Sequence, residues 1–291
     1  MELTPQLATD ILLPALGAGV VAVLATVAVE RLGGAAGGIV SSVPTTIVPA
    51  AIGIHAAAAD DASFRRAMCF VPVGILLNAG YLMLWRVLPA RIGMRSHRHL
   101  LAATTTCALG AWILAALAVV GSNELLRPGP QATAIMGIAA FALGIALGIA
   151  ANRVPHHAPK GSRRVGPAVL ALRGIAAAAA IGVAMLLARS GLPVAGSIAS
   201  VFPVIFTTII IATWLAQGPQ VPTGAVGPLM LGTLSVSAYA LLAAVLFPAM
   251  HVAAAAAACW LASVALVSVP AFLWLRRVRR RALSASPSTS A

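Results

Sequence analysis

The sequence predicts an all-α membrane protein of about nine transmembrane helices, built as two inverted four-helix repeats joined by a central helix. Its composition points to a membrane, because 60% of the 291 residues are hydrophobic and 9% are charged, too few to cover a water-soluble globule. Nine apolar segments are long enough to cross a hydrocarbon core about 30 Å thick. A motif shared by the second and seventh segments predicts that both helices are broken.

The nine segments alternate with short polar or basic loops. They span residues 11–29, 33–58, 67–89, 100–121, 131–152, 166–188, 192–216, 225–248 and 252–275. The first follows a stretch that contains Glu2 and Asp10 but no Lys or Arg, which is not typical of a cleaved signal peptide. We therefore expect it to remain as the first spanning helix.

The shared motif reads G-x-I-x-S-x-[V/F]-P and runs from Gly37 to Pro44 and again from Gly196 to Pro203. Proline removes a backbone donor, and in a bilayer the freed groups need partners from protein or a water-filled cavity. Two half-helices around a substrate site would supply them. A re-entrant hairpin, or close packing of small residues, is the alternative.

The repeat extends beyond this motif. Gly74 and Tyr81 in the third segment match Gly232 and Tyr239 in the eighth. Segments one to four therefore correspond to six to nine. Because five segments separate equivalent helices, the two halves should have opposite orientations. The expected division is 1–125 for the first repeat, 126–160 for the linker helix and basic loop, 161–278 for the second repeat, and 279–291 for the tail.

The distribution of basic residues predicts the orientation. With the N-terminus outside and the C-terminus inside, 15 of the 19 Lys and Arg residues lie on the cytoplasmic side, as the positive-inside rule requires. The net charge of +13 is thus explained without nucleic acid as a partner. We expect a multi-pass protein of a bacterial cytoplasmic (inner) membrane.

Two inverted halves with interrupted helices in corresponding positions resemble small secondary transporters, in which broken helices meet near the midplane. The glycine-rich run before each proline is similar to the motifs of the TauE/SafE-type anion exporters, over about a dozen residues in each half. The glycine-to-proline spacing is longer here, so that family's substrate is not carried over.

The residues around both breaks, most of them hydroxyl side chains, are the expected substrate site. They are Gly37, Ser41, Ser42, Pro44, Thr45, Thr46, Gly196, Ser197, Ser200, Pro203, Thr207 and Thr208, with Asn78 from the third segment. The eighth segment adds Thr233, Ser235 and Ser237. Alternatively, Ser and Thr bond back to their own helices.

Acidic residues are scarce in the apolar segments. Glu30 is either a proton-coupling group or an interfacial partner of Arg31. Asp60 and Asp61 are expected to solvate the outer loop together with neighbouring arginines. Without a buried acid, the expected solute is an anion, a zwitterion or a neutral polar molecule. His55 and His251 lie near outer helix ends, where each could pack or act as a pH-sensitive gate.

We expect a secondary transporter (permease or exporter) that works by alternating access. No metal site, cofactor or catalytic residue is predicted, because no hydrolase, zinc or phosphate-binding motif is found. A non-catalytic scaffold or assembly subunit is the alternative, and an integral membrane enzyme is less favoured. The expected partners are membrane lipid and the solute. A coupling ion (H⁺ or Na⁺), a homodimer, the substrate and the direction of transport stay open.

Overall fold

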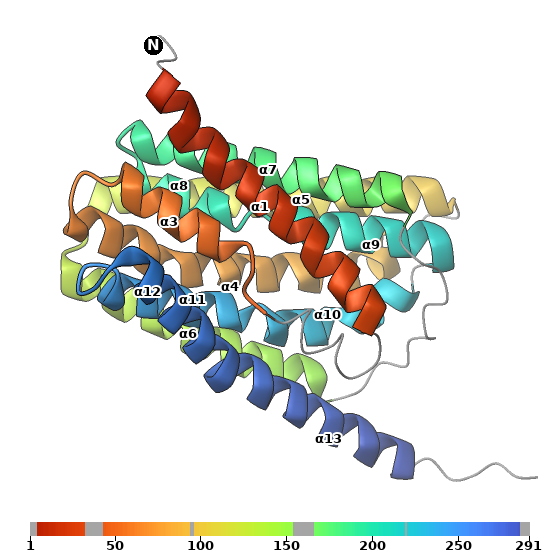
Figure 1. Ribbon diagram of the computed structural model, residues 1–291. Helices are drawn as coiled ribbons and strands as arrows, with labels where there is room; N and C mark the ends of the chain where they lie inside the picture. Colours follow the sequence, from red (N-terminus) through yellow and green to blue (C-terminus); the bar gives the residue numbers. More distant parts are fainter. Residues whose placement is uncertain (1–4, 33–42, 94–95, 154–165, 219, 286–291) are drawn as a thin grey trace, which may run out of the picture.

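The computed structural model describes residues 5–32, 43–93, 96–153, 166–218 and 220–285, which form helices and no strand. The helices are α1 (Pro5–Leu32), α3 (Ile47–Ala57), α4 (Asp61–Ile92), α5 (His97–Leu126), α6 (Pro130–Asn152), α7 (Pro167–Arg189), α8 (Pro193–Ser200), α9 (Val204–Gln217), α10 (Gln220–Gly232), α11 (Leu234–Leu246), α12 (Val252–Ser263), the π-helical η1 (Val264–Ser268) and α13 (Val269–Ala285). Most of them lie side by side, while α1 crosses the others diagonally (Figure 1).

Seven helical stretches of the described chain are long and apolar enough to span a membrane. They are Asp61–Ile92, His97–Leu126, Pro130–Asn152, Pro167–Arg189, Pro193–Leu215, Thr223–Leu246 and Val252–Val278. Two shorter apolar stretches, Ile11–Leu24 and Ile47–Ala57, fall in the first and second predicted segments. The class of helical, multi-span membrane protein is therefore confirmed, and the count of nine stays a prediction.

Helix α4 occupies the centre of the bundle and packs against α5, α6, α8 and α11. Its side chains Phe64, Met68 and Trp85 are fully buried. Helices α5 and α6 instead expose large apolar side chains, such as Leu114 with 69% of its surface accessible and Ile138 with 58%. Such residues are compatible with lipid on the outside of the bundle, where no water has to be excluded.

Glycine residues allow α1 and α7 to cross at close range. A Cβ atom on Gly19 would lie 2.8 Å from the carbonyl oxygen of Gly174, and one on Gly174 would lie 3.3 Å from that of Gly19. Small residues let helix backbones approach in a membrane, where packing rather than the hydrophobic effect drives association. The contact is reciprocal, with each glycine facing the other.

Helix α6 carries a stripe of small and polar residues on its buried face. The stripe consists of Thr133, Gly137, Ala140, Gly144, Gly148 and Asn152. A Cβ on Gly137 would lie 2.6 Å from the carbonyl oxygen of Cys69 in α4, and one on Gly148 would lie 2.7 Å from the side chain of Leu231 in α10. The predicted linker helix thus packs against helices of both halves of the chain.

The break predicted in the seventh segment is present, since α8 and α9 are separated by Val201–Pro203. In the second segment α3 begins at Ile47, and the motif residues Gly37, Ser41 and Ser42 lie outside the described residues. The structure adds a one-residue interruption that the sequence does not predict, at Thr233 between α10 and α11, where the backbone keeps helical dihedral angles.

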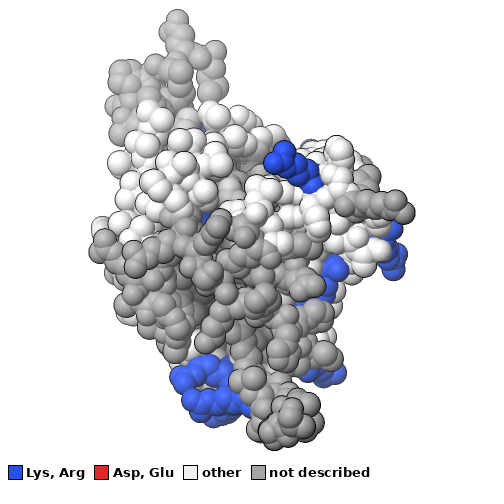
Figure 2. All heavy atoms as spheres, turned by 90° about the vertical axis from the view of Figure 1, so that its right-hand side faces the viewer, with Lys and Arg blue, Asp and Glu red and all other residues white. Residues whose placement is uncertain are grey.

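The two ends of the bundle differ in charge. The end formed by the last turn of α4, the first turn of α5 and the middle and end of α13 carries Arg91, Arg98, Arg276 and Arg277. On the face shown in Figure 2, Lys and Arg side chains are visible and no Asp or Glu is seen among the described residues. The described carboxylates Asp60, Asp61 and Glu124 lie at the opposite helix ends.

Candidate functional site

Among the cavities between the described residues, two bear on the predicted site. The first, here called the vestibule, has a volume of about 880 Å³ and lies at the end that carries the described carboxylates, between the α3–α4 connection, the end of α5 and the first turns of α6 and α8. The second, here called the central cavity, has a volume of about 80 Å³ and lies next to the break between α8 and α9. A space of that size holds a few water molecules or a small group.

The central cavity brings together predicted site residues from both halves. Its lining includes Thr46 immediately before α3, Asn78 from α4, Ser200 at the end of α8 and Pro203 in the break. Thr233, at the interruption between α10 and α11, completes the polar part of the lining. The other lining side chains include Ile47, Ile75, Ile181 and Phe206, so the cavity is apolar apart from a few convergent polar groups.

The other predicted site residues that the structure describes do not line this cavity. Pro44, Gly196 and Ser197 are buried, and Thr45, Thr207 and Thr208 are half-buried. Gly196 packs against α7, where an added Cβ would lie 2.7 Å from the carbonyl oxygen of Ala184. The side chain of Glu30 lies outside the described residues, as do Gly37, Ser41 and Ser42.

Asn78 holds the broken segment in place. Its side-chain Nδ2 donates a hydrogen bond of 2.8 Å to the carbonyl oxygen of Val201, which lies in the break. The indole Nε1 of Trp112 in α5 donates a 2.7 Å bond to Asn78 Oδ1. Asn78 is only 2% exposed, so both bonds form away from water. The carbonyl oxygen of Val201, which has no described partner within its own helix, is thus paired by Asn78, and the bond from Trp112 in α5 fixes the orientation of the Asn78 side chain.

A second connection joins α4 to the start of α9. The hydroxyl of Thr207 donates a 2.6 Å bond to the carbonyl oxygen of Pro203. The Tyr81 hydroxyl lies 2.8 Å from Thr207 Oγ1. Because the single hydroxyl hydrogen of Thr207 is already used, Tyr81 is the donor in this contact. Tyr81 and Asn78 lie one turn apart on α4, so this helix contacts the chain both within the break and in the first turn of α9.

The hydroxyl groups around the break bond to their own helices. Ser197 donates to Val194, Ser200 to Ser197, Thr208 to Ile205 and Thr233 to Met230, all to carbonyl oxygens at 2.7 to 2.9 Å. This is the alternative that the sequence leaves open. Since each hydroxyl has one hydrogen, the Ser200 and Thr233 side chains present lone pairs to the central cavity and act there as acceptors.

A layer of packed side chains separates the two cavities. On α4 the vestibule ends at Cys69 and the central cavity begins at Ile75, and Gly74 lies between them. Gly74 faces α8, where an added Cβ would lie 3.4 Å from Ile198 and still closer to Val201. In α7 the fully buried Met185 lies between Ile181, which lines the central cavity, and Ala188, which lines the vestibule. The vestibule is thus closed at its inner end in this conformation.

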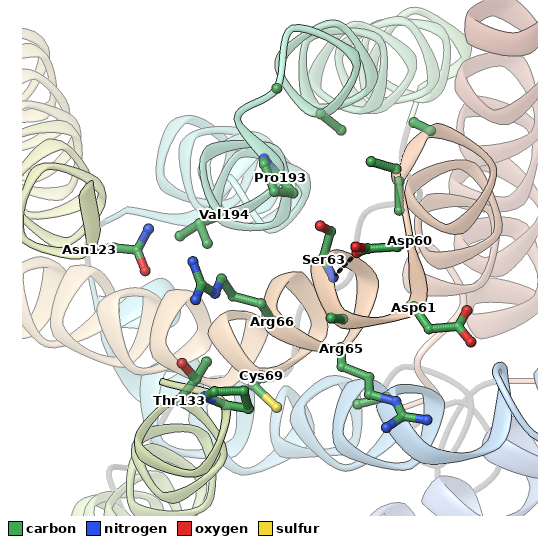
Figure 3. Close-up of a pocket in the computed structure, with 18 of the residues that line it drawn as sticks. Asp60, Asp61, Ser63, Arg65, Arg66, Cys69, Asn123, Thr133, Pro193 and Val194 are labelled. Carbon is green, nitrogen blue, oxygen red and sulfur yellow. Dashed lines mark hydrogen bonds between the residues drawn. The ribbon is translucent and has the colours of Figure 1, made fainter. Parts of the chain in front are cut away.

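The vestibule has charged side chains at two depths (Figure 3). Asp60, Asp61, Arg65 and Glu124 are exposed at its rim, whereas Arg66 is half-buried. Asp60 caps α4 by accepting a 2.7 Å bond from the backbone N–H of Ser63, and this bond lowers the pKa of its carboxyl group.

The two histidines near these helix ends differ in setting. The ring of His55 packs edge-on against Phe64 and Phe247, at centroid distances of 4.8 and 5.6 Å, while His251 is exposed. Within the described chain, no group of three or more His, Cys, Asp or Glu side chains is placed to hold a metal ion.

No protein-family model, curated protein or solved structure matches this chain. The class that the fold itself defines is that of a multi-span, α-helical membrane protein.

Proposed function

We propose that the protein is a secondary transporter that moves a small polar solute across the cytoplasmic membrane by alternating access. The observation that carries this proposal is the central cavity, where the break between α8 and α9 faces Thr46, next to the motif of the second segment. Interrupted helices that meet around a small cavity with few polar groups are the usual substrate site of such transporters.

The pairing of equivalent helices supports an inverted repeat. Helix α1 packs along α7 and α4 packs along α11, and these are the pairs that the sequence repeat relates. Elements close to a two-fold axis lie against their equivalents, as these two pairs of helices do. The inner side would then be the basic end of Figure 2 and the outer side the end with the vestibule.

The lining of the central cavity supports an uncharged or zwitterionic solute, or an anion, over a cation held by carboxylates. No carboxylate is present among the described lining residues. The same lack of acid and base groups supports a transporter over an enzyme. Glu30 as a coupling group, H⁺ or Na⁺ as the driving ion, and a homodimer remain open within this proposal.

A non-catalytic scaffold is the second candidate, and one observation favours it. The hydroxyls of Ser200 and Thr233 already have their hydrogen bonds within the helices, as they would if they only supported packing. The two functions differ in whether water and solutes reach Ser200 from both sides of the membrane.

Thiol labelling of Ser200→Cys distinguishes them. Cys69, Cys107 and Cys259 are first replaced by alanine, and the variant is reconstituted in proteoliposomes of one orientation. Alternating access predicts that a membrane-impermeant thiol reagent modifies Cys at 200 from either side. The matched control is Ser263→Cys, because Ser263 is fully buried in α12 and does not line a described cavity. If Cys at position 200 reacts no faster than Cys at 263 from either side, the transporter proposal fails.

A further inference from the structure

Arg66 is a cation of the vestibule whose described partner is neutral. It projects from α4 into the cavity (Figure 3), and its Nη2 donates a 3.0 Å bond to the carbonyl oxygen of Pro128. No carboxylate among the described residues forms an ion pair with it, although Asp60 and Asp61 are near in sequence. A half-buried guanidinium with a neutral partner retains donors that a carboxylate can accept in a bidentate arrangement.

Asn123 adds a buried acceptor to the wall of the same cavity. This residue, near the end of α5, is 5% exposed, and its Nδ2 donates a 3.0 Å bond to Glu124 Oε1. Its Oδ1 is buried and has no hydrogen-bond partner among the described residues. In Figure 3 the Asn123 side chain and the guanidinium end of Arg66 point toward one another, and both residues line the vestibule. Buried polar atoms are nearly always paired, so an orphaned oxygen on a cavity wall indicates a missing donor.

The overall charge of the vestibule limits what can enter. Its lining contains three carboxylates, Asp60, Asp61 and Glu124, and three arginines, Arg65, Arg66 and Arg189. A balanced lining does not concentrate multiply charged anions or cations from solution. Its volume of about 880 Å³ and its alanine and valine side chains leave room for an apolar group on the ligand.

We propose that the vestibule binds a small organic acid that carries a hydrogen-bond donor next to its carboxylate, such as an α-amino or α-hydroxy acid. The carboxylate binds the guanidinium of Arg66, and the neighbouring ammonium or hydroxyl group donates to Asn123 Oδ1. Such acids would be the solute class of the transporter proposed above. The role of the vestibule, to collect solute on the outer side of the packed layer between the two cavities, rests on that proposal. Binding itself is measured without transport.

Three acids with the same carbon frame test the two contacts separately. L-alanine, L-lactate and isobutyrate carry an ammonium, a hydroxyl and a methyl group on the carbon next to the carboxylate. Binding is measured by saturation-transfer NMR on the full-length protein in lipid nanodiscs. We expect alanine and lactate to bind about tenfold more tightly than isobutyrate, because only they pair the orphaned oxygen.

The variants assign each contact to its residue. Arg66→Gln should weaken binding of all three acids about tenfold, and Arg66→Lys should weaken it less, because a single ammonium replaces the bidentate fork. Asn123→Leu should bring the three affinities to about the same value. Asn123→Asp, which keeps the shape of the side chain, should favour alanine over lactate because a carboxylate attracts the ammonium. The matched control is Arg91→Gln, an exposed arginine in the last turn of the same helix that does not line the vestibule, and it should change nothing.

The proposal is overturned if none of the three acids binds, if Arg66→Gln binds them as the natural sequence does, or if the preference over isobutyrate persists in Asn123→Leu. Native-like thermal unfolding of each variant shows that a loss of binding is not a loss of folding. The labelling of Ser200→Cys does not depend on any of these results, so this proposal and the proposed function can fail separately.

Discussion

The interaction of Asn78 with Trp112 allows a quantitative test of how the break between α8 and α9 is stabilised. Asn78→Leu keeps a side chain of similar size but leaves the carbonyl of Val201 and the indole N–H of Trp112 without their hydrogen bonds. Side-chain hydrogen bonds in membrane proteins contribute about 0.6 kcal/mol on average and about 1.7 kcal/mol at most. The loss of two such bonds should therefore cost about 1 to 3 kcal/mol of unfolding free energy.

A double-mutant cycle with Trp112→Phe isolates one of the two bonds. The coupling energy between Asn78 and Trp112 should be about 0.6 to 1.7 kcal/mol, because the double variant removes both partners. Unfolding is followed by intrinsic fluorescence during titration of mixed micelles with a denaturing detergent. Trp214→Phe is the matched control, since Trp214 is equally buried and its indole nitrogen has no hydrogen-bond partner in the described structure.

Two results would refute this reasoning. One is a coupling energy close to zero. The other is a larger loss of stability for Trp214→Phe than for Trp112→Phe. Both substitutions remove a similar apolar area, but only Trp112→Phe removes a hydrogen bond, so it should be the more destabilising of the two.

Three further predictions concern packing, pH and orientation. Gly137→Ala should lower the free energy of unfolding by about 1 to 3 kcal/mol through overpacking, since its Cβ would lie 2.6 Å from a carbonyl oxygen of α4. Gly110→Ala is the control and should leave thermal unfolding nearly unchanged, because no atom lies within 4 Å of the added Cβ. The bond from Ser63 lowers the pKa of Asp60, so the ionised carboxylate should stabilise the fold above the ordinary aspartate pKa of 3.8. This stabilisation should be lost as the pH falls through the lower pKa of the folded state, and Asp60→Asn should remove that pH dependence from the unfolding midpoint. A reporter that is active only in the cytoplasm should work after the C-terminus and fail after Asn123, and activity in both fusions would contradict the proposed topology.

The neighbouring arginines Arg65 and Arg66 differ in exposure, and the sequence does not predict this difference. Their position beside Asp60 and Asp61 predicts a solvated loop for both, and this holds for Arg65, which is exposed. Arg66 is one position further along α4, where the helical rotation of about 100° per residue turns its side chain into the cavity. The sequence carries no signal for this difference, because the cavity wall facing Arg66 comes from α5 and α6.

The break in the seventh segment is predictable because its cause is local. Proline lacks a backbone donor wherever it stands in a chain, and the motif that ends in Pro203 occurs twice, so the sequence alone predicts an interruption there. The same kind of reasoning does not predict the interruption at Thr233, which has no proline next to it and whose hydroxyl bonds to Met230. Pro228 lies one turn earlier, inside α10, and does not end that helix.

The sequence by itself determined the membrane class, the positions of the apolar helices and one break, because hydrophobicity and the loss of a backbone donor are properties of single residues and short segments. Only the tertiary structure decided which groups satisfy that break. Asn78 reaches Val201 across 123 residues and receives its own bond from Trp112 across 34. Such partners depend on which helices pack together, and in lipid the choice follows from close contacts at glycines such as Gly19, Gly74 and Gly137 rather than from the apolar pattern that all these helices share.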